Sequence, residues 1–400
     1  MNPSGRRLMV IFAGDHKSAR KKGVEGLLLQ YDEEGFFEKV FLVSPYLRRD
    51  ARIELDGRHE LREFGFGGGR LIRRLLSPFH LLRVIVACAR LTRRSHIDLI
   101  RATEPTLCGV VAWAVSRLTG IPYCLSLHAD YDKRFELDGA RGAPTLFGGR
   151  ALVRVLERFT LRGAVRVMPI RESLVRYATS RGVAVDKVCV IPHGIDLRPY
   201  SCPPVVDVRK LLGLPSSKAL IAFAGRLSPE NYVSDMLDAA RRLAESRDDF
   251  VLVLAGGGVL EPQIAARVAA DTVLTRVVRM LGFVPPETVR ALRSACAVSL
   301  CLMGGYSLIE ACAAGRPVIS YDVEWHHELV IDGRTGRLLA EHDTVGVADA
   351  IAAMLDDPTS AQLMGEEAKT LAYARHSLVR AQETRRRMYA EILGDRPRNS

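Results

Sequence analysis

The chain has 400 residues, of which 48% are hydrophobic and 26% charged, enough for a buried core divided over two or three domains. No stretch of about 18 uncharged apolar residues occurs and the N-terminus lacks a signal peptide's long apolar segment, which excludes a transmembrane class and predicts a cytoplasmic protein. The net charge of +11 is uneven, because residues 1–200 contain 34 Lys and Arg against 21 Asp and Glu while the remainder carries −2, so the first half should meet an anionic partner.

The first half alternates short extended segments with amphipathic helical patterns, which is typical of parallel α/β units. Strands are predicted at 8–13, 39–43, 98–102, 121–127, 165–169 and 187–191. Helices are predicted at 23–30, 70–94, 106–118, 151–161 and 172–181.

Residues 192–215 are rich in proline and polar residues, and the alternation starts afresh after them, so we place an interdomain linker there. Strands follow at 220–224, 250–255, 277–281, 297–301 and 317–321, and helices at 232–246, 344–355, 359–375 and 378–392. The predicted class is α/β, with two Rossmann-like domains that face one another across a cleft. They span residues 1–192 and 193–375, and residues 376–400 form a helix that packs back on the first domain.

The eight cysteines lie singly in apolar segments. There is no Cys-x-x-Cys pair and no histidine at zinc-finger spacing. We therefore expect reduced core cysteines and no metal site.

Ligands of open parallel sheets bind beyond the carboxyl ends of the strands, so the junctions that follow strands are candidate sites. Arg226 follows the strand at 220–224, and its guanidinium suits a diphosphate; the alternative is an arginine in a solvated loop. The next junction contains Gly256, Gly257 and Gly258, which allow backbone to approach a ligand or simply form a tight turn.

The third junction contains Phe283 and Val284, an apolar ledge for the face of a base or a plain core contact. The fourth opens a helix with Gly304 and Gly305, and the free N–H groups at such a helix start suit a phosphate. Glu310 lies about one turn into this helix, where its carboxylate would accept a hydrogen bond from a ribose hydroxyl. Its neighbours are apolar, so burial of Glu310 without a partner would be costly.

Taken together, these motifs resemble the retaining glycosyltransferases of family four, which have the GT-B fold. The resemblance is carried by residues 191–196, 225–230, 256–258, 282–284 and 307–318, and in the first half by 121–128. It implies transfer of a sugar from a nucleotide-sugar donor, most commonly a UDP- or GDP-sugar, with retention of anomeric configuration. The implied acceptor is a glycan, a lipid-linked glycan or a small molecule, and no metal or other cofactor is implied.

The resemblance also assigns roles to individual residues. Arg226 would contact the donor diphosphate, Glu310 the ribose, and Phe283 with Val284 would flank the base. The phosphates would be bound by the backbone N–H groups of Gly305, Tyr306, Ser307 and Leu308.

In the first half, the resemblance places His128, at the end of a predicted strand, against the transferred sugar or its leaving phosphate. The competing interpretation is a core histidine. Asp130 in the following polar loop, and Arg101, are candidates for the acceptor side.

Two positions depart from the family pattern. The family commonly has a lysine shortly after the arginine, where this chain has Asn231, and a glutamate eight positions before the second one, where it has Leu302. The departures raise an alternative function, a nucleotide-sugar-binding protein or partner subunit without catalytic activity.

Residues 70–94 contain seven arginines and no acid, interleaved with apolar side chains. This pattern predicts either an interfacial helix pair on anionic lipid, which would place the protein at the inner membrane face, or a core helix with a solvated basic face. Nucleic acid is not the expected partner, because the chain has no P-loop, no zinc framework and only 6% aromatic residues.

Overall fold

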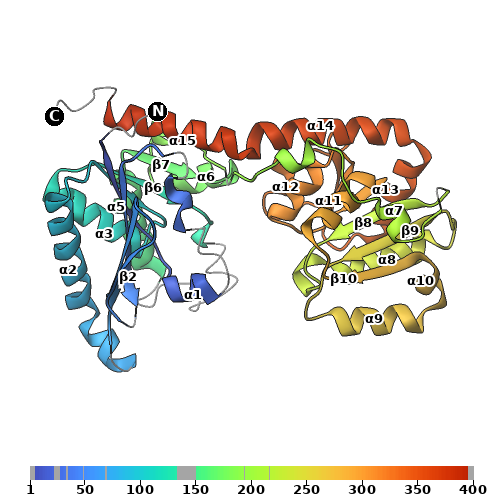
Figure 1. Cartoon of the computed structure of the whole chain (residues 1–400), viewed down its shortest axis with the longest axis horizontal. Coiled ribbons are helices and arrows are strands. Elements are labelled where there is room, and N and C mark those ends of the chain that lie inside the picture. The colour runs from blue at the N-terminus through green and yellow to red at the C-terminus, as the bar shows by residue number, and fades with distance from the viewer. Residues whose placement is uncertain are drawn as a thin grey trace. The chain divides into compact units, whose positions relative to one another are not determined.

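The computed structural model describes residues 5–21, 28–32, 35–47, 49–67, 70–132, 150–192, 194–215 and 217–394. The chain divides into two compact units: unit 1 comprises residues 1–192 and 381–400, and unit 2 comprises residues 193–380. Each unit contains one parallel or predominantly parallel sheet with helices packed against it (Figure 1). This architecture confirms the predicted α/β class.

The sheet of unit 1 has seven strands in the order β3-β4-β2-β1-β5-β6-β7. Their bounds are β1 (Arg7–Ile11), β2 (Lys39–Leu47), β3 (Ala51–Glu54), β4 (His59–Gly65), β5 (Leu99–Ala102), β6 (Tyr123–Leu127) and β7 (Arg166–Pro169). Only the β3–β4 pair is antiparallel among these strands. From β1 the chain winds to β2 on one side and later to β5 on the other, so the topological switch point lies between β1 and β5.

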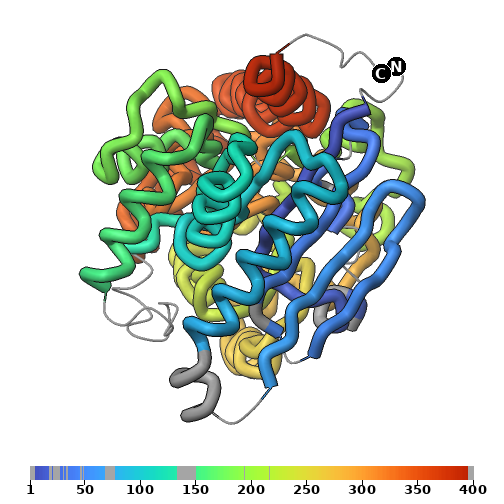
Figure 2. The backbone as a smooth tube through the Cα atoms, turned by 90° about the vertical axis from the view of Figure 1, so that its left-hand side faces the viewer, coloured from blue at the N-terminus to red at the C-terminus, as the bar shows by residue number. Residues whose placement is uncertain are grey.

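The helices of unit 1 cover both faces of its sheet. They are α1 (His16–Lys21), α2 (Arg70–Arg94), α3 (Leu107–Thr119), α5 (Arg150–Gly163), α6 (Ser173–Ser180) and α15 (Leu378–Leu393). Alternate strand residues face opposite ways, so Met9 packs toward α2 and α3 whereas Leu8 packs toward Tyr389 of α15. Helices α2 and α3 lie side by side over their face of the sheet (Figure 2).

Three first-half predictions need correction or limitation. Residues 187–191 are not a strand: they form one bridge, Val167–Val188, because the 3-10 helix η5 (Val185–Lys187) occupies the start of the segment. Of the two alternatives for residues 70–94, a helix pair or a single helix, the structure has one continuous helix, α2. Most of the helix expected at 23–30 lies outside the described residues.

The sheet of unit 2 has six parallel strands in the order β10-β9-β8-β11-β12-β13. Their bounds are β8 (Ala219–Ala224), β9 (Phe250–Ala255), β10 (Val278–Gly282), β11 (Val298–Leu300), β12 (Val318–Tyr321) and β13 (Gly336–Leu339). The chain passes from β8 to β9 on one side and from β11 to β12 on the other. The switch point of unit 2 therefore lies between β8 and β11.

The helices of unit 2 form two layers. They are α7 (Val208–Leu211), α8 (Val233–Leu243), α9 (Glu261–Ala270), α10 (Thr272–Val277), α11 (Pro286–Ala295), α12 (Tyr306–Ala313), α13 (Thr344–Asp356) and α14 (Pro358–His376). Helices α8 and α13 pack on one core cluster, whereas α7 and α11 share a second and α12 and α14 a third. Short 3-10 turns η6 (Arg198–Tyr200), η7 (Pro229–Asn231) and η8 (His326–Glu328) connect these elements.

Two carboxylates and three arginines join α5 and α6 to the segment after β6. Glu157 is fully buried and accepts from Arg150 at 2.6 Å and from the Tyr177 hydroxyl at 2.7 Å. Burial by itself raises the pKa of Asp132, but hydrogen bonds from Arg181, Arg150 and Arg154 outweigh it and lower the pKa to about 2. The stabilisation from Asp132 is therefore complete above the usual pKa of 3.8 and is lost only as the pH falls toward 2.

Replacing Glu157 by Gln should lower the free energy of unfolding by about 3 kcal/mol, because Arg150 and Arg181 would lose a buried counter-charge. Urea unfolding followed by circular dichroism measures this change. The matched control is Glu38→Gln, which removes a half-exposed contact with Arg7 at 3.9 Å and should change stability by less than about 1 kcal/mol. Equal effects of the two substitutions would contradict a special role for the buried cluster.

Candidate functional site

Arg226 follows β8 at the switch point of unit 2 and is exposed. Its guanidinium makes no hydrogen bond or ion pair with any residue that the structure describes. Its backbone is held firmly, since the Asn231 carboxamide donates to the Arg226 carbonyl at 2.7 Å and the Leu227 N–H donates to the Gly257 carbonyl at 3.0 Å. The arginine therefore presents a cation without a direct ion pair from a fixed loop, with the carboxylate of Glu230 within electrostatic range.

Asn231 stands where the family resemblance leads one to expect a lysine, and it has a different function in the structure. Its Nδ2 donates to the Arg226 carbonyl and, at 3.3 Å, to the Ser228 hydroxyl. The side chain thus stabilises the loop that carries Arg226.

The glycines after β9 allow that turn to pack against the Arg226 loop. Gly256 has a φ of 131°, and a Cβ there would lie 1.9 Å from the Gly225 carbonyl oxygen. A Cβ on Gly258 would lie 2.3 Å from the Leu227 carbonyl oxygen, whereas one on Gly257 would meet only the flexible Glu261 carboxylate at 2.9 Å. The close backbone approach that the sequence suggested for a ligand is made here to a neighbouring loop.

The start of α12 lies across the switch point, after β11. Gly304 is buried, and a Cβ on it would lie 2.5 Å from the Ser307 hydroxyl oxygen and 2.6 Å from the Cys301 sulfur, so a side chain here would force these neighbours to move. Gly305 is the N-cap of α12 and makes no side-chain capping hydrogen bond. A Cβ added to Gly305 would have no other atom within 4 Å. The helix therefore begins without a side-chain cap at Gly305, and the positive end of its dipole lies at this junction.

Glu310 of α12 is paired with a residue that sequence reasoning missed. Its Oε2 accepts from Arg293 of α11, whose side chain is only 4% exposed, while Glu310 itself is 38% exposed. The other terminal nitrogen of Arg293 donates to the Ala224 carbonyl, the last residue of β8, at 3.1 Å. Burial by itself lowers the pKa of Arg293, but Tyr200 and Glu310 outweigh it and raise the pKa above its usual value, so the guanidinium stays protonated.

A sequence signal for Arg293 did exist. The residue lies on the buried face of α11 beside Ala291 and Leu292, where an apolar residue is expected. A charged side chain in such a place needs a partner. The sequence does not reveal that the partner is Glu310, because the two are 17 residues apart on different helices.

The other predicted residues of unit 2 differ in exposure. Phe283 follows β10 and is 90% exposed, while Val284 is half-buried and packs against the cluster of α7 and α11. Leu302 is fully buried in the core shared with α8 and α13. A carboxylate at Leu302 would therefore lie in the core, and this position supplies no polar contact to the site.

Unit 1 places three predicted residues near the carboxyl ends of its strands. His128 follows β6 and is half-buried, and Asp130 accepts from the Asp132 N–H at 2.9 Å. Arg101 of β5 lies at the switch point of unit 1 and is 8% exposed. It donates to Ser126 Oγ at 3.1 Å and to the Tyr389 hydroxyl at 3.0 Å, and no carboxylate among the described residues pairs with it.

Several expected features concern metals, membranes and thiols. Within the described ranges, no group of three or more His, Cys, Asp or Glu side chains is arranged to hold a metal ion. No helix of the described part is long and apolar enough to cross a membrane. All eight cysteines are free thiols, but Cys202 is exposed rather than a core residue because it lies in the linker.

Comparisons with known proteins agree with this arrangement. The profile of the family "Glycosyl transferases group 1" matches residues 207–371, and that of the "Glycosyl transferase 4-like domain" matches residues 23–194. A curated relative is 2-deoxystreptamine glucosyltransferase of Streptomyces kanamyceticus, which is 29% identical over 71% of this chain and 74% of its own length.

Solved structures share the fold of the whole chain. Sucrose-phosphate synthase of Thermosynechococcus elongatus superposes with a TM-score of 0.67 at 19% identity, over 98% of this chain and 100% of that one. Anabaena Alr3699/HepE in complex with UDP gives a TM-score of 0.66 at 16% identity, over 96% and 100%. The fold, the profiles and the relatives together show that this chain belongs to the GT-B glycosyltransferases of group 1.

Proposed function

We propose that unit 2 binds the diphosphate of a UDP- or GDP-sugar at its switch point, and that the sugar passes, with retention of configuration, to an acceptor on unit 1. The observation that carries the proposal is the presence of two features that favour an anion at one switch point of the sheet. The unpaired guanidinium of Arg226 follows β8, and the uncapped start of α12 follows β11. The Anabaena protein, which shares the fold, has been solved in complex with UDP, which supports a nucleotide as a ligand of this fold.

The chemistry follows from charge development. As the sugar departs, the β-phosphate gains negative charge while the sugar becomes oxocarbenium-like. Arg226 and the N–H groups of Gly305, Tyr306, Ser307 and Leu308 stabilise that phosphate. Because these groups are already oriented, they need little reorganisation in the transition state. His128 of unit 1 contacts the transferred sugar or its leaving phosphate.

Separate residues would contact the ribose and the base of the nucleoside. Glu310 Oε2 is occupied by Arg293, while Oε1 makes no hydrogen bond with a described residue and accepts from a ribose hydroxyl in the proposed complex. Phe283, a large ring left 90% exposed, stacks on the base beside Val284. Gly257, where the protein imposes little steric demand, lets the turn after β9 approach the nucleotide.

The acceptor side of the proposal rests on Arg101. A buried guanidinium without a carboxylate partner is costly, and an anionic group of the acceptor would supply the missing charge. Asp130 lies in the loop that follows the neighbouring strand β6, where its carboxylate would contact acceptor hydroxyls.

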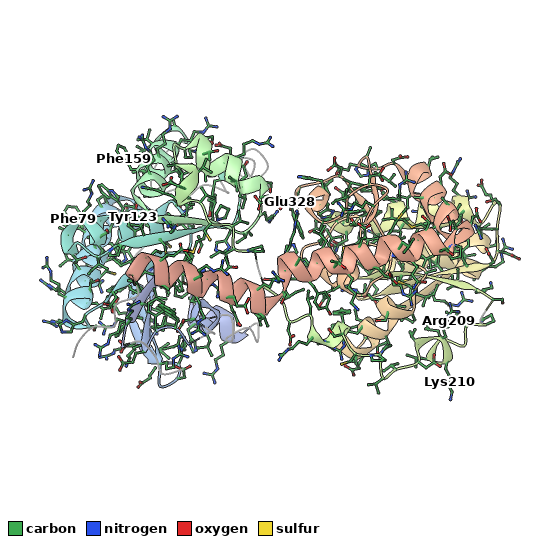
Figure 3. The ribbon with its side chains drawn as sticks, turned by 90° about the horizontal axis from the view of Figure 1, so that it is seen from above. Phe79, Tyr123, Phe159, Arg209, Lys210 and Glu328 are labelled. Carbon is green, nitrogen blue, oxygen red and sulfur yellow. The ribbon has the colours of Figure 1, made fainter. Side chains whose placement is uncertain are left out.

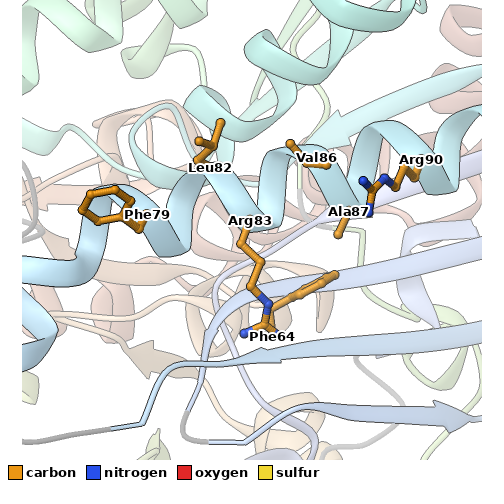
Figure 4. A pocket seen from close by; sticks show the side chains of 7 residues that line it. All are labelled: Phe64, Phe79, Leu82, Arg83, Val86, Ala87 and Arg90. Atoms are coloured by element: carbon orange, nitrogen blue, oxygen red, sulfur yellow. The ribbon is translucent and has the colours of Figure 1, made fainter.

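The outer helices of unit 1 support a third proposal, contact with an anionic membrane that carries a lipid-linked acceptor. Phe79 and Leu82 of α2 are 71% and 59% exposed, beside a shallow groove of about 550 Å³ toward which Arg83 extends (Figure 4). Helix α5 adds a second exposed apolar row, Leu152, Val155 and Phe159, and Phe159 lies on the surface of unit 1 like Phe79 (Figure 3).

The charge of these helices favours lipid. Helices α2, α3 and α5 contain one acidic residue among them, Glu157, and it is fully buried. Their exposed polar surface is therefore cationic and lies next to apolar side chains, which suits an anionic lipid headgroup region more than nucleic acid.

For the donor site, Arg226→Ala should lower kcat for sugar transfer by about a hundredfold or more and leave the melting temperature unchanged, because the side chain is exposed. The assay measures transfer and donor hydrolysis with a panel of UDP- and GDP-sugars. Arg241→Ala is the control, since Arg241 is also exposed but pairs with Asp271 near the far end of α8. Wild-type turnover in the Arg226 variant would refute the assignment, and donor binding without any transfer in the wild type would favour a non-catalytic binder.

For the acceptor site, Arg101→Gln should abolish a preference for anionic over neutral acceptors while donor hydrolysis continues at the wild-type rate. The measurement compares KM for phosphorylated and neutral acceptors. Arg6→Gln is a suitable control, because Arg6 is as buried as Arg101 and donates to the Gly394 carbonyl. Arg6 immediately precedes β1, so it lies at the end of the sheet opposite to the carboxyl ends of the parallel strands. An unchanged acceptor preference would exclude Arg101 from the acceptor site.

For the membrane surface, the protein should float with vesicles that contain phosphatidylglycerol and not with pure phosphatidylcholine vesicles, and salt should weaken the binding. Arg90→Glu combined with Phe159→Ser should release most of the bound protein. Lys210→Glu, an exposed site on α7 of unit 2, should bind as the wild type does (Figure 3). Absence of flotation at low salt would remove the membrane proposal.

A further inference from the structure

A buried histidine connects the two ends of the turn between β11 and α12. His326 of η8 is fully buried, and its Nδ1 lies 2.6 Å from the hydroxyl of Ser320 on β12. Ser320 donates to the Cys301 carbonyl at 2.9 Å. On its other side, His326 Nε2 lies 3.2 Å from the Gly304 backbone nitrogen and 3.1 Å from the Gly304 carbonyl oxygen.

Either tautomer of a neutral His326 connects Ser320 to the Gly304 backbone. If Nδ1 carries the proton, it donates to the Ser320 oxygen, and Nε2 accepts from the Gly304 N–H. If Nε2 carries the proton, it donates to the Gly304 carbonyl, and Nδ1 accepts from the Ser320 hydroxyl.

We propose that His326 is the positioning residue that holds the turn at Gly304 and Gly305 in the shape that receives the donor diphosphate. The inference rests on the proposed donor site. Neither Gly304 nor Gly305 has a side chain that could hold the turn, and Gly305 caps α12 without a side-chain hydrogen bond. The Cys301 thiol makes only a weak contact with the Met303 carbonyl, at 3.6 Å. His326 supplies the missing restraint from a neighbouring strand connection.

A positioning role for His326 and an ordinary core role differ in their expected effect on donor binding. A residue that only fills the core affects stability, whereas a residue that orients the Gly304 N–H also affects the N–H groups that follow it on α12. Loss of the restraint should therefore weaken donor binding more than any fall in stability explains, because oriented N–H groups lose their advantage once the turn moves.

The experiment compares three substitutions in the full-length protein. His326→Leu removes both hydrogen bonds, His326→Gln keeps an amide oxygen that can accept from Gly304, and Ser320→Ala removes only the partner of Nδ1. His327→Ala is the matched control, because the adjacent His327 is 51% exposed and contacts Asp322 at 3.5 Å. Donor KM and kcat, UDP binding by calorimetry and the melting temperature are measured for each.

We expect His326→Leu to raise the donor KM and the UDP dissociation constant by about tenfold or more. His326→Gln should recover most of that loss although its melting temperature stays below that of the wild type, and Ser320→Ala should fall between them. His327→Ala should match the wild type.

Unchanged UDP affinity in folded His326→Leu would overturn the inference. If His326→Leu does not fold, Ser320→Ala and His326→Gln decide: a lower melting temperature with wild-type UDP affinity in both would show a structural role alone. A wild-type protein that binds no nucleotide in calorimetry would instead contradict the proposed donor site, whatever the variants do.

Discussion

The ion pair between Arg293 and Glu310 is the interaction on which the arrangement of unit 2 depends. Arg293 is almost fully buried, so its charge must be compensated, and it bridges the last carbonyl of β8 to the carboxylate on α12. These two elements leave the sheet on opposite sides of the switch point. The buried Arg293 guanidinium therefore links the end of the strand that precedes Arg226 to the helix that carries Glu310.

Around this pair the site has a supporting layer and an exposed layer. Asn231 and His326 belong to the supporting layer, because their hydrogen bonds end on the backbone of the loops that carry the site. Arg226, Gly305 and Phe283 form the exposed layer. Such a division is what electrostatic catalysis requires: groups aimed at a developing charge must be oriented in advance, and neighbours that do not touch the ligand maintain that orientation.

The buried arginines of unit 1 differ in whether they have a carboxylate partner. Where carboxylates are available, as around Glu157, its buried arginines are paired. Arg101 at the switch point is surrounded by neutral acceptors instead, and the outer helices expose arginines beside apolar side chains. The arginines that make the first half basic thus fall into three groups: those paired with buried carboxylates, Arg101 as a candidate acceptor contact, and those of the outer helices as a candidate membrane surface.

The sequence by itself determined the fold class, most of the parallel strands and the four strand ends of unit 2, because buried parallel strands are continuous apolar runs that end in glycine-rich junctions. Strands β3, β4 and β13 escaped prediction, since all three carry polar residues, and β3 and β13 also lie at sheet edges. Family resemblance added the glycosyltransferase activity, which the comparisons confirmed. Only the tertiary structure decided the partners of Glu310, the function of Asn231 and the position of His326. These depend on which side chains from distant segments meet after folding, and a linear pattern of residue types does not encode those contacts.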